Sequence, residues 1–307
     1  MTRAGTSALA FKELLVVTGK GGVGKSAVTA ALGLLLRDLG RRTLLLEVDP
    51  RESLHNWLEV PPSGGGIVEV RRGLYLQHLS PRHEMDDLVR EHLRLGPLIR
   101  RVLASPVYGH FADGAPGLKE LAVLGHANRL VRGPRVKGAP PVDIVVLDAP
   151  ASGHGVSLLT APALAASVIR QGPFGRMATH LTELVADERR CGIVVVTLAE
   201  EMPAQEALEL QETLVARLGR PPDLLVVNGL YPPLTEGVAV AARDRAGVEL
   251  WRTRRSVNER ELARLRAAWT GPAIELPLLP FDRGGQLIAA LRDHLDGAFG
   301  PGAGDRR

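Results

Sequence analysis

The stretch "VTGKGGVGKSAVTAALG", Val17 to Gly33, decides the fold. Its G-x-x-x-x-G-K-S pattern is that of a loop whose backbone N–H groups surround phosphate oxygens, followed by a helix whose positive end strengthens the attraction. Lys25 is then placed to reach the outer phosphates, and the Ser26 hydroxyl to bind Mg²⁺. Lys20 is a second lysine, which a simple phosphate-binding loop does not need.

Continuous apolar runs lie on both sides of this loop and recur along the chain. Such runs are typical of strands buried on both faces, as in a parallel sheet. The expected strands are "ELLVVT" (13–18), "RTLLLEVD" (42–49), "DIVVLDAP" (143–150), "GIVVVTLA" (192–199), "DLLVVNG" (223–229) and "PAIELPLL" (272–279). Helical patterns alternate with them at 27–39, 203–218 and 285–299. The sequence therefore predicts an α/β fold with a doubly wound, mostly parallel sheet.

Between 81 and 132 the pattern changes to amphipathic helices without an intervening strand, and another helical stretch covers about 161–187. We expect a single phosphate-loop domain over 11–300, with these helices forming a subdomain above the carboxyl edge of the sheet, where ligands bind in such folds. For 161–187, an ordinary crossover helix is an equally good interpretation. The tail 301–307 is expected to be disordered.

Composition limits the class of protein further. The chain has 307 residues, a formal net charge of +4 and one cysteine, Cys191, so an intrachain disulfide framework is excluded. It has no apolar run of about 18 residues, the length that a membrane-spanning helix needs. The first residues pass into a strand pattern without the apolar core of a signal peptide. We expect a cytoplasmic protein, with no nucleic acid as partner.

Two aspartates, Asp49 and Asp148, end predicted strands at the edge that carries the phosphate loop. Carboxylates at this position can hold Mg²⁺ or its waters, or orient the water that attacks the γ-phosphate. A single aspartate there is more often a helix cap or turn former, but two beside a phosphate loop favour function. Asn228 ends another strand and can offer a donor and an acceptor to adenine; a turn with Gly229 is the alternative.

These motifs together resemble a known family. "GKGGVGKS" is similar to the deviant phosphate loop of the MinD/ParA/ArsA class, whose signature lysine corresponds to Lys20. Within that class, four segments resemble the ArsA family in order: "EVDP" (47–50) its first switch, "LDAPASGHGVSLLTAP" (147–162) its second, "VVNGL" (226–230) its adenine-reading segment and "LPLLPFDRGG" (276–285) its C-terminal segment. The resemblance runs from Leu14 to about Leu295, nearly the whole chain.

The resemblance implies a Mg²⁺-dependent ATPase that works as a dimer, either a homodimer or a heterodimer with a related ATPase. Its implied cofactors are ATP and Mg²⁺, and its partner is an unidentified client or membrane-associated protein. The implied catalytic residues are Lys20, which reaches the phosphates of the opposite subunit, Lys25, and Asp49, which positions or activates the attacking water. The implied nucleotide contacts are Gly19, Lys20, Gly21, Gly22, Val23, Gly24, Lys25, Ser26, Ala27, Asp148, Asn228 and Pro277. Mg²⁺ would be held by Ser26, Asp49 and Asp148, the carboxylates directly or through water.

The sequence also departs from the family pattern. Ser53 stands where the first switch usually has asparagine, and His55 or Asn56 could take that role instead. The cysteines of the family's arsenite and zinc sites have no counterparts, so no arsenite site is evident. The alternative function is a MinD- or ParA-like positioning ATPase on a membrane or DNA. Segment 285–299 has few cations on its polar face, so we interpret it as a core helix rather than a membrane-binding one.

Overall fold

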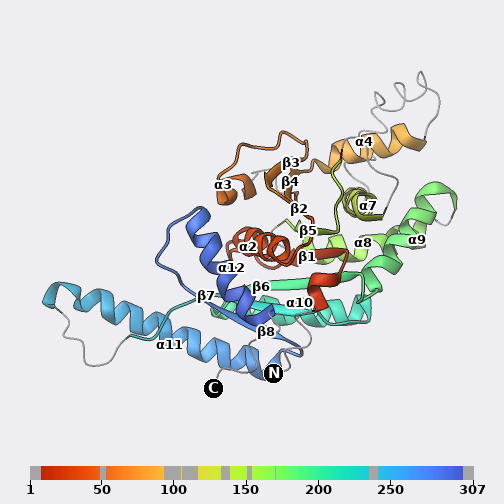
Figure 1. Cartoon of the computed structure of the whole chain (residues 1–307). Helices are drawn as coiled ribbons and strands as arrows, with labels where there is room; N and C mark the ends of the chain where they lie inside the picture. Colours follow the sequence, from red (N-terminus) through yellow and green to blue (C-terminus); the bar gives the residue numbers. More distant parts are fainter. Residues whose placement is uncertain are drawn as a thin grey trace.

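Eight strands form one sheet in a computed structural model that describes residues 8–48, 53–92, 105, 117–132, 139–150, 154–169, 171–234 and 241–299. The order across the sheet is β3-β4-β2-β5-β1-β6-β7-β8, and Figure 1 shows the strands following one another from top to bottom in this order. Their bounds are β1 Leu14–Thr18, β2 Thr43–Glu47, β3 Val68–Arg71, β4 Leu74–His78, β5 Ile144–Asp148, β6 Cys191–Leu198, β7 Leu224–Leu230 and β8 Ala273–Pro277.

Helices connect the strands. Within the described residues they are α2 Lys25–Asp38, α3 Leu54–Leu58, α4 Pro81–His92, α7 Leu118–Arg132, α8 His154–Val168, α9 Gly172–Ala186, α10 Glu201–Leu218, α11 Arg245–Ala268 and α12 Gly285–Phe299, with short 3-10 turns at Ala8–Phe11 and Ala242–Asp244. None of these helices combines the length and the apolar character that crossing a lipid bilayer requires.

The sheet confirms the predicted α/β class. All its pairings are parallel except that of β3 with β4. The six predicted strands appear as β1, β2, β5, β6, β7 and β8. Strands β3 and β4 were not predicted. In β3 the side chains alternate between half-buried and exposed, because this strand is the edge of the sheet.

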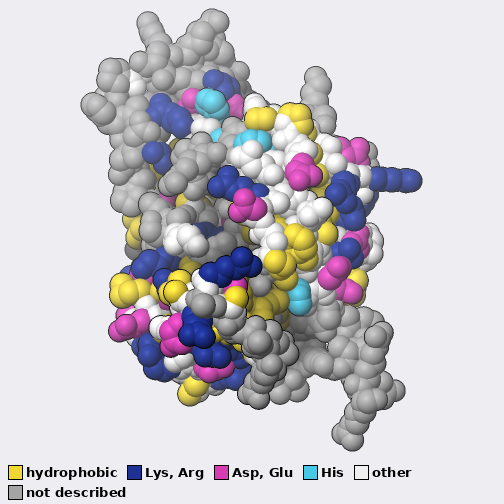
Figure 2. Space-filling model, turned by 90° about the vertical axis from the view of Figure 1, so that its left-hand side faces the viewer, with side chains coloured by type: hydrophobic (Ala, Val, Ile, Leu, Met, Phe, Trp, Pro, Cys, Tyr) yellow, Lys and Arg dark blue, Asp and Glu magenta, His cyan; other side chains and the backbone are white. Residues whose placement is uncertain are grey.

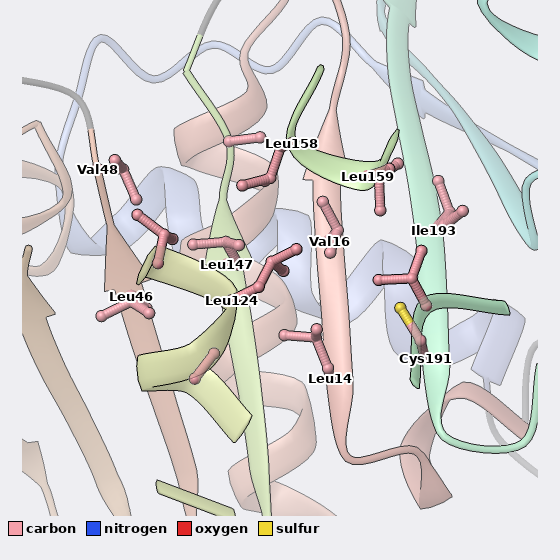
Figure 3. Close-up of a cluster of buried hydrophobic side chains, with 14 of the residues drawn as sticks. Leu14, Val16, Leu46, Val48, Leu124, Leu147, Leu158, Leu159, Cys191 and Ile193 are labelled. Carbon is pink, nitrogen blue, oxygen red and sulfur yellow. The ribbon is translucent and has the colours of Figure 1, made fainter. Parts of the chain in front are cut away.

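Two hydrophobic layers enclose the sheet because its central strands bury apolar side chains on both faces. One layer joins the sheet to α2 and α12. The other joins it to α7, α8, α9 and α10. Figure 3 shows part of this second layer, in which Leu14, Val16 and Leu147 of the sheet face Leu124 of α7. The sole cysteine, Cys191, is fully buried there, and burial raises the pKa of its thiol to about 12.

The helical subdomain expected over 81–132 stays a prediction, because the structure describes only 81–92, 105 and 117–132 of it. Within these residues, α7 buries Leu121 and Leu124 against the sheet face and α4 packs on α7. Helices α8 and α9 also bury side chains in this layer. Helix α12 buries Ile288 and Leu295 beside α2, which makes it the core helix that we predicted.

Candidate nucleotide-binding site

The loop 19–24 connects β1 to α2, and its backbone has a positive φ at Gly19, Gly22 and Gly24; at Gly19 and Gly24 a neighbour also leaves no room for a side chain. Gly19 has φ +142°, and a Cβ there would lie 2.1 Å from the carbonyl oxygen of Val196. Gly24 has φ +90°, and a Cβ there would lie 2.3 Å from Nδ2 of Asn228. A side chain at either position would therefore displace β6 or Asn228. The loop therefore fits closely against β6, the neighbour of β1, and against β7, the next strand along the sheet.

Lys25 and Ser26 open helix α2, where the unpaired N–H groups and the helix dipole favour an anion. The Lys25 side chain is buried, and its ammonium donates to the carbonyl of Lys20 across the loop at 2.9 Å. A buried cation enclosed by the loop is well placed to contact a phosphate. Ala27, which follows Ser26 in α2, is buried beneath the loop and supports it by packing.

Asp148, the last residue of β5, receives two hydroxyl hydrogen bonds from α2. Ser26 donates to Oδ2 at 2.6 Å and Thr29 to Oδ1 at 3.1 Å. The pKa of Asp148 is raised to about 6: burial is the largest cause and the nearby Glu47 carboxylate adds to it, while Ser26, Lys25 and Thr29 oppose the rise. A hydroxyl backed by a buried carboxylate suits a hard cation such as Mg²⁺, which prefers oxygen ligands. Ser26 and Asp148, both predicted to hold Mg²⁺, are thus in direct contact with each other.

Glu47 is a second buried carboxylate beside this pair. It is the last residue of β2 and lies directly opposite Asp148 in the parallel register. Its Oε1 accepts from the Ser53 hydroxyl at 2.7 Å and from the Ser53 backbone N–H at 2.5 Å. The Leu54 N–H adds a further bond at 3.1 Å, so Glu47 fixes the start of α3. The Ser53 oxygen in turn lies 3.2 Å from that of Ser26.

Lys20 points to the other side of the loop, where its ammonium pairs with Glu206 of α10 at 2.5 Å. Both side chains are about one-third exposed, at 33% and 39%. They border a cavity of about 340 Å³ between the end of β1, the start of α8 and α10, lined also by Thr18 and Gly155. Lys20 is thus held by a partly exposed ion pair with another residue of the same chain.

Two further predicted nucleotide contacts, Asn228 for the base and Pro277, lie on β7 and β8. Asn228 belongs to β7 together with Gly229, so the pair does not form the turn considered as the alternative. Its Nδ2 donates to the Val23 carbonyl at 2.9 Å, which ties the strand to the phosphate loop. Pro277 ends β8, beside Leu230 of β7.

Of the remaining predicted residues, Gly21 and Gly22 lie exposed on the loop and Val23 is buried beneath it. Asp49 lies outside the described residues. Among the three candidates for the first-switch asparagine, Ser53 contacts the loop through Ser26. Sequence reasoning missed Glu47 and Glu206. A charged residue in the apolar run "TLLLEV" was a usable signal for Glu47, but Glu206 lies on a helix rich in glutamates and gave none.

Charges of both signs cover the side of the molecule that Figure 2 shows. On this face the Lys and Arg side chains of the described residues are interspersed with Asp and Glu side chains, and hydrophobic side chains lie between them. The field around such a surface is local, set by pairs such as Lys20 and Glu206, rather than by one extended patch.

The fold and the loop together define a phosphate-loop nucleotide-binding protein, because the strand, the glycine loop, the buried lysine and the hydroxyl–carboxylate pair occur in the expected order. Comparison of the sequence with protein families makes this specific. The model of the "Anion-transporting ATPase" family matches residues 12–175, which contain the loop, Glu47 and Asp148. The chain belongs to this family of ArsA-type ATPases.

Individual relatives extend the similarity toward the C-terminus. The ATPase BagA of Mycobacterium tuberculosis is 29% identical over 242 residues, which cover 74% of this chain and 67% of that protein. The arsenical pump-driving ATPase of Escherichia coli is 26% identical over 301 residues, 92% of this chain but 48% of that protein. That of Acidiphilium multivorum is 26% identical over 256 residues. The chain thus spans about half the length of the pump-driving relatives.

Proposed function

We propose that this protein is a Mg²⁺-dependent molecular switch that hydrolyses ATP to ADP and phosphate between two closing subunits and so acts on a client. The observation that carries the proposal is the Ser26 hydroxyl on the buried Asp148 carboxylate, 2.6 Å away, beside the buried Lys25. A phosphate-binding cation and a metal-binding hydroxyl then stand side by side at one helix start.

Each residue has a distinct task in this proposal. Lys25 and the loop N–H groups bind the outer phosphates, while Asp148 orients the Ser26 hydroxyl toward the cation that accompanies ATP. When bound, Mg²⁺ neutralises charge on the phosphate oxygens. Asp49 would position or activate the attacking water, as the resemblance to the first switch implies. Asn228 and Pro277 would lie along the adenine.

Lys20 would act on the phosphates of the opposite subunit. To do so it must leave Glu206, and a partly exposed ion pair of this kind is worth at most about 1 kcal/mol. That cost is small beside the gain from a cation delivered in trans, which in other phosphate-loop enzymes accelerates hydrolysis by roughly 10³-fold or more. The second subunit would be another copy of this chain or a related ATPase, and the client or membrane-associated partner is unidentified.

A mixing experiment tests the proposal. Lys20→Ala and Lys25→Ala chains are each assayed alone for phosphate release from ATP, and both should be inactive. Mixed together, they should regain activity at one site per dimer, because the Lys20→Ala subunit keeps a working loop and receives Lys20 from its neighbour. The control is a mixture of Lys25→Ala with a Lys20→Ala, Lys25→Ala double variant, which should stay inactive. Mixed dimers without activity, despite demonstrated subunit exchange, would reject action in trans.

A further inference from the structure

Two carboxylate–hydroxyl pairs face one another between β2 and β5. Glu47 and Asp148 lie directly opposite each other in the register of β2 and β5, and they are only 1% and 3% exposed. Ser53 donates to Glu47 at 2.7 Å and Ser26 donates to Asp148 at 2.6 Å. The site therefore has a second pair, built like the one on which the proposed function rests.

The direction of each hydroxyl proton follows from the number of protons and the acceptors available to them. Each serine hydroxyl has a single proton, and a short bond to a carboxylate is stronger than a bond to another hydroxyl. Ser53 and Ser26 therefore both direct their protons outward, toward Glu47 and Asp148. Their oxygens, 3.2 Å apart, then face each other with lone pairs. Two acceptor oxygens converge on one point, with a negative charge behind each.

The spacing of these oxygens suits a divalent cation. Mg²⁺ binds oxygen at about 2.1 Å in octahedral geometry, so two neighbouring ligand oxygens are about 3.0 Å apart. The 3.2 Å separation is close to that value. A cation at this point would also relieve the repulsion between the two buried carboxylates, which is one of the causes that raise the pKa of Asp148.

We infer that Ser53 is a second hydroxyl ligand of the nucleotide-bound cation, next to Ser26, and that Glu47 is the positioning residue that orients it. The inference rests on the proposed function, because the cation arrives with the nucleotide. Glu47 also accepts the Ser53 and Leu54 backbone N–H groups, so the same carboxylate holds the start of α3. The cation would thus bridge the phosphate loop and α3.

Binding of Mn²⁺ to the full chain with saturating ADP tests this, with free Mn²⁺ followed by electron paramagnetic resonance. Ser53→Ala and Glu47→Gln should weaken Mn²⁺ binding by roughly 10-fold or more, the scale expected when support for a metal ligand is lost. Glu47→Gln keeps an acceptor oxygen for the backbone N–H groups but removes the charge. Ser53→Thr keeps the hydroxyl and should bind Mn²⁺ like the wild type.

Matched controls separate a role at the metal from a role in folding. Glu59→Gln changes a carboxylate at the other end of α3, which bonds to Gly285, and should leave Mn²⁺ affinity unchanged. ADP affinity in EDTA, measured by calorimetry, should be the same for every variant.

Three results would overturn the inference in different ways. Wild-type Mn²⁺ affinity in Ser53→Ala, with weakened affinity in Ser26→Ala, would leave the proposed function standing and exclude Ser53 as a ligand. Reduced ADP affinity of Ser53→Ala in EDTA would assign Ser53 to the shape of the loop instead. A wild-type chain that binds neither ADP nor Mn²⁺ would remove the proposed function and the inference with it.

Discussion

Replacing Asp148 with asparagine should stabilise the nucleotide-free protein although it removes a residue of the proposed site. The folded chain keeps the Asp148 proton up to about pH 6, whereas the unfolded chain loses it near 3.8. Because the folded-state pKa is the higher one, this group's contribution to stability falls as pH rises from about 4 to about 6. Above that range the buried carboxylate is ionised in the folded protein, and it lowers the free energy of unfolding by its full amount.

The size of the effect follows from the two pKa values. A rise from 3.8 to about 6 corresponds to an upper limit of about 3 kcal/mol in the free energy of unfolding. For a chain of this length that is a gain of about 5 °C in Tm for Asp148→Asn at pH 7.5. At pH 4 the folded protein keeps the proton and the unfolded chain has lost it in only about 60% of molecules, so the cost is about half a kcal/mol and the two proteins should differ little.

The assay is thermal unfolding followed by circular dichroism at pH 4 and pH 7.5, in EDTA and without nucleotide. Asp143→Asn, at the start of the same strand, is the matched control. Hydrogen bonding to Arg42 holds the pKa of Asp143 below its usual value, so this replacement should lower stability at pH 7.5 and lose its effect as pH falls through the acidic range. An Asp148→Asn protein that is no more stable than the wild type at pH 7.5, or equally stabilised at both pH values, would refute the reasoning.

Other replacements test single contacts. Glu206→Gln should raise steady-state phosphate release by up to about five-fold, because it frees Lys20 from an ion pair worth at most about 1 kcal/mol. An equal rise in a chain that also carries Lys20→Ala would contradict this explanation. Asp49→Asn should bind nucleotide but lose turnover by ~10²-fold, the scale of a lost general base, and unchanged turnover would exclude that role. Asn228→Ala should lose the preference for ATP over GTP in competitive binding. An equal loss of both nucleotides would instead assign Asn228 to its bond with Val23.

The sequence allowed the centre of the fold and the loop to be predicted because both depend on local patterns. Strands buried on both faces show as continuous apolar runs, and the phosphate loop needs glycine where φ is positive, as at Gly24. The rule that parallel strands end at one edge placed Asp148 beside the phosphate loop, whereas its hydrogen bond from Ser26 was not predicted. Strands β3 and β4 were missed because neither has such a run: β3 is a half-buried edge strand, and β4 (LYLQH) ends in the polar residues Gln77 and His78.

Helix α11 was missed for a different reason. Its buried positions include the polar residues Asn258 and Glu261, so it lacks the apolar stripe by which an amphipathic helix is recognised. Asn258 compensates by hydrogen bonds to the backbone of Tyr231 and Ala199, both 2.9 Å long. The pair of Ser53 with Glu47 was equally hidden, since it depends on how α3 folds back toward β2 rather than on any spacing in the sequence.

The burial of Cys191 makes this protein convenient to label. Thiol reagents attack the thiolate, and a fully buried cysteine whose pKa is about 12 presents almost none at neutral pH. A cysteine placed on the surface, for example on the exposed side of α10 near Glu206, would therefore be the only site to take up a fluorophore or a crosslinker in the folded chain. Distances between the two labelled subunits of the proposed dimer could then be followed during the proposed cycle of ATP hydrolysis. Slow modification of Cys191 itself would report the fraction of molecules that have come open.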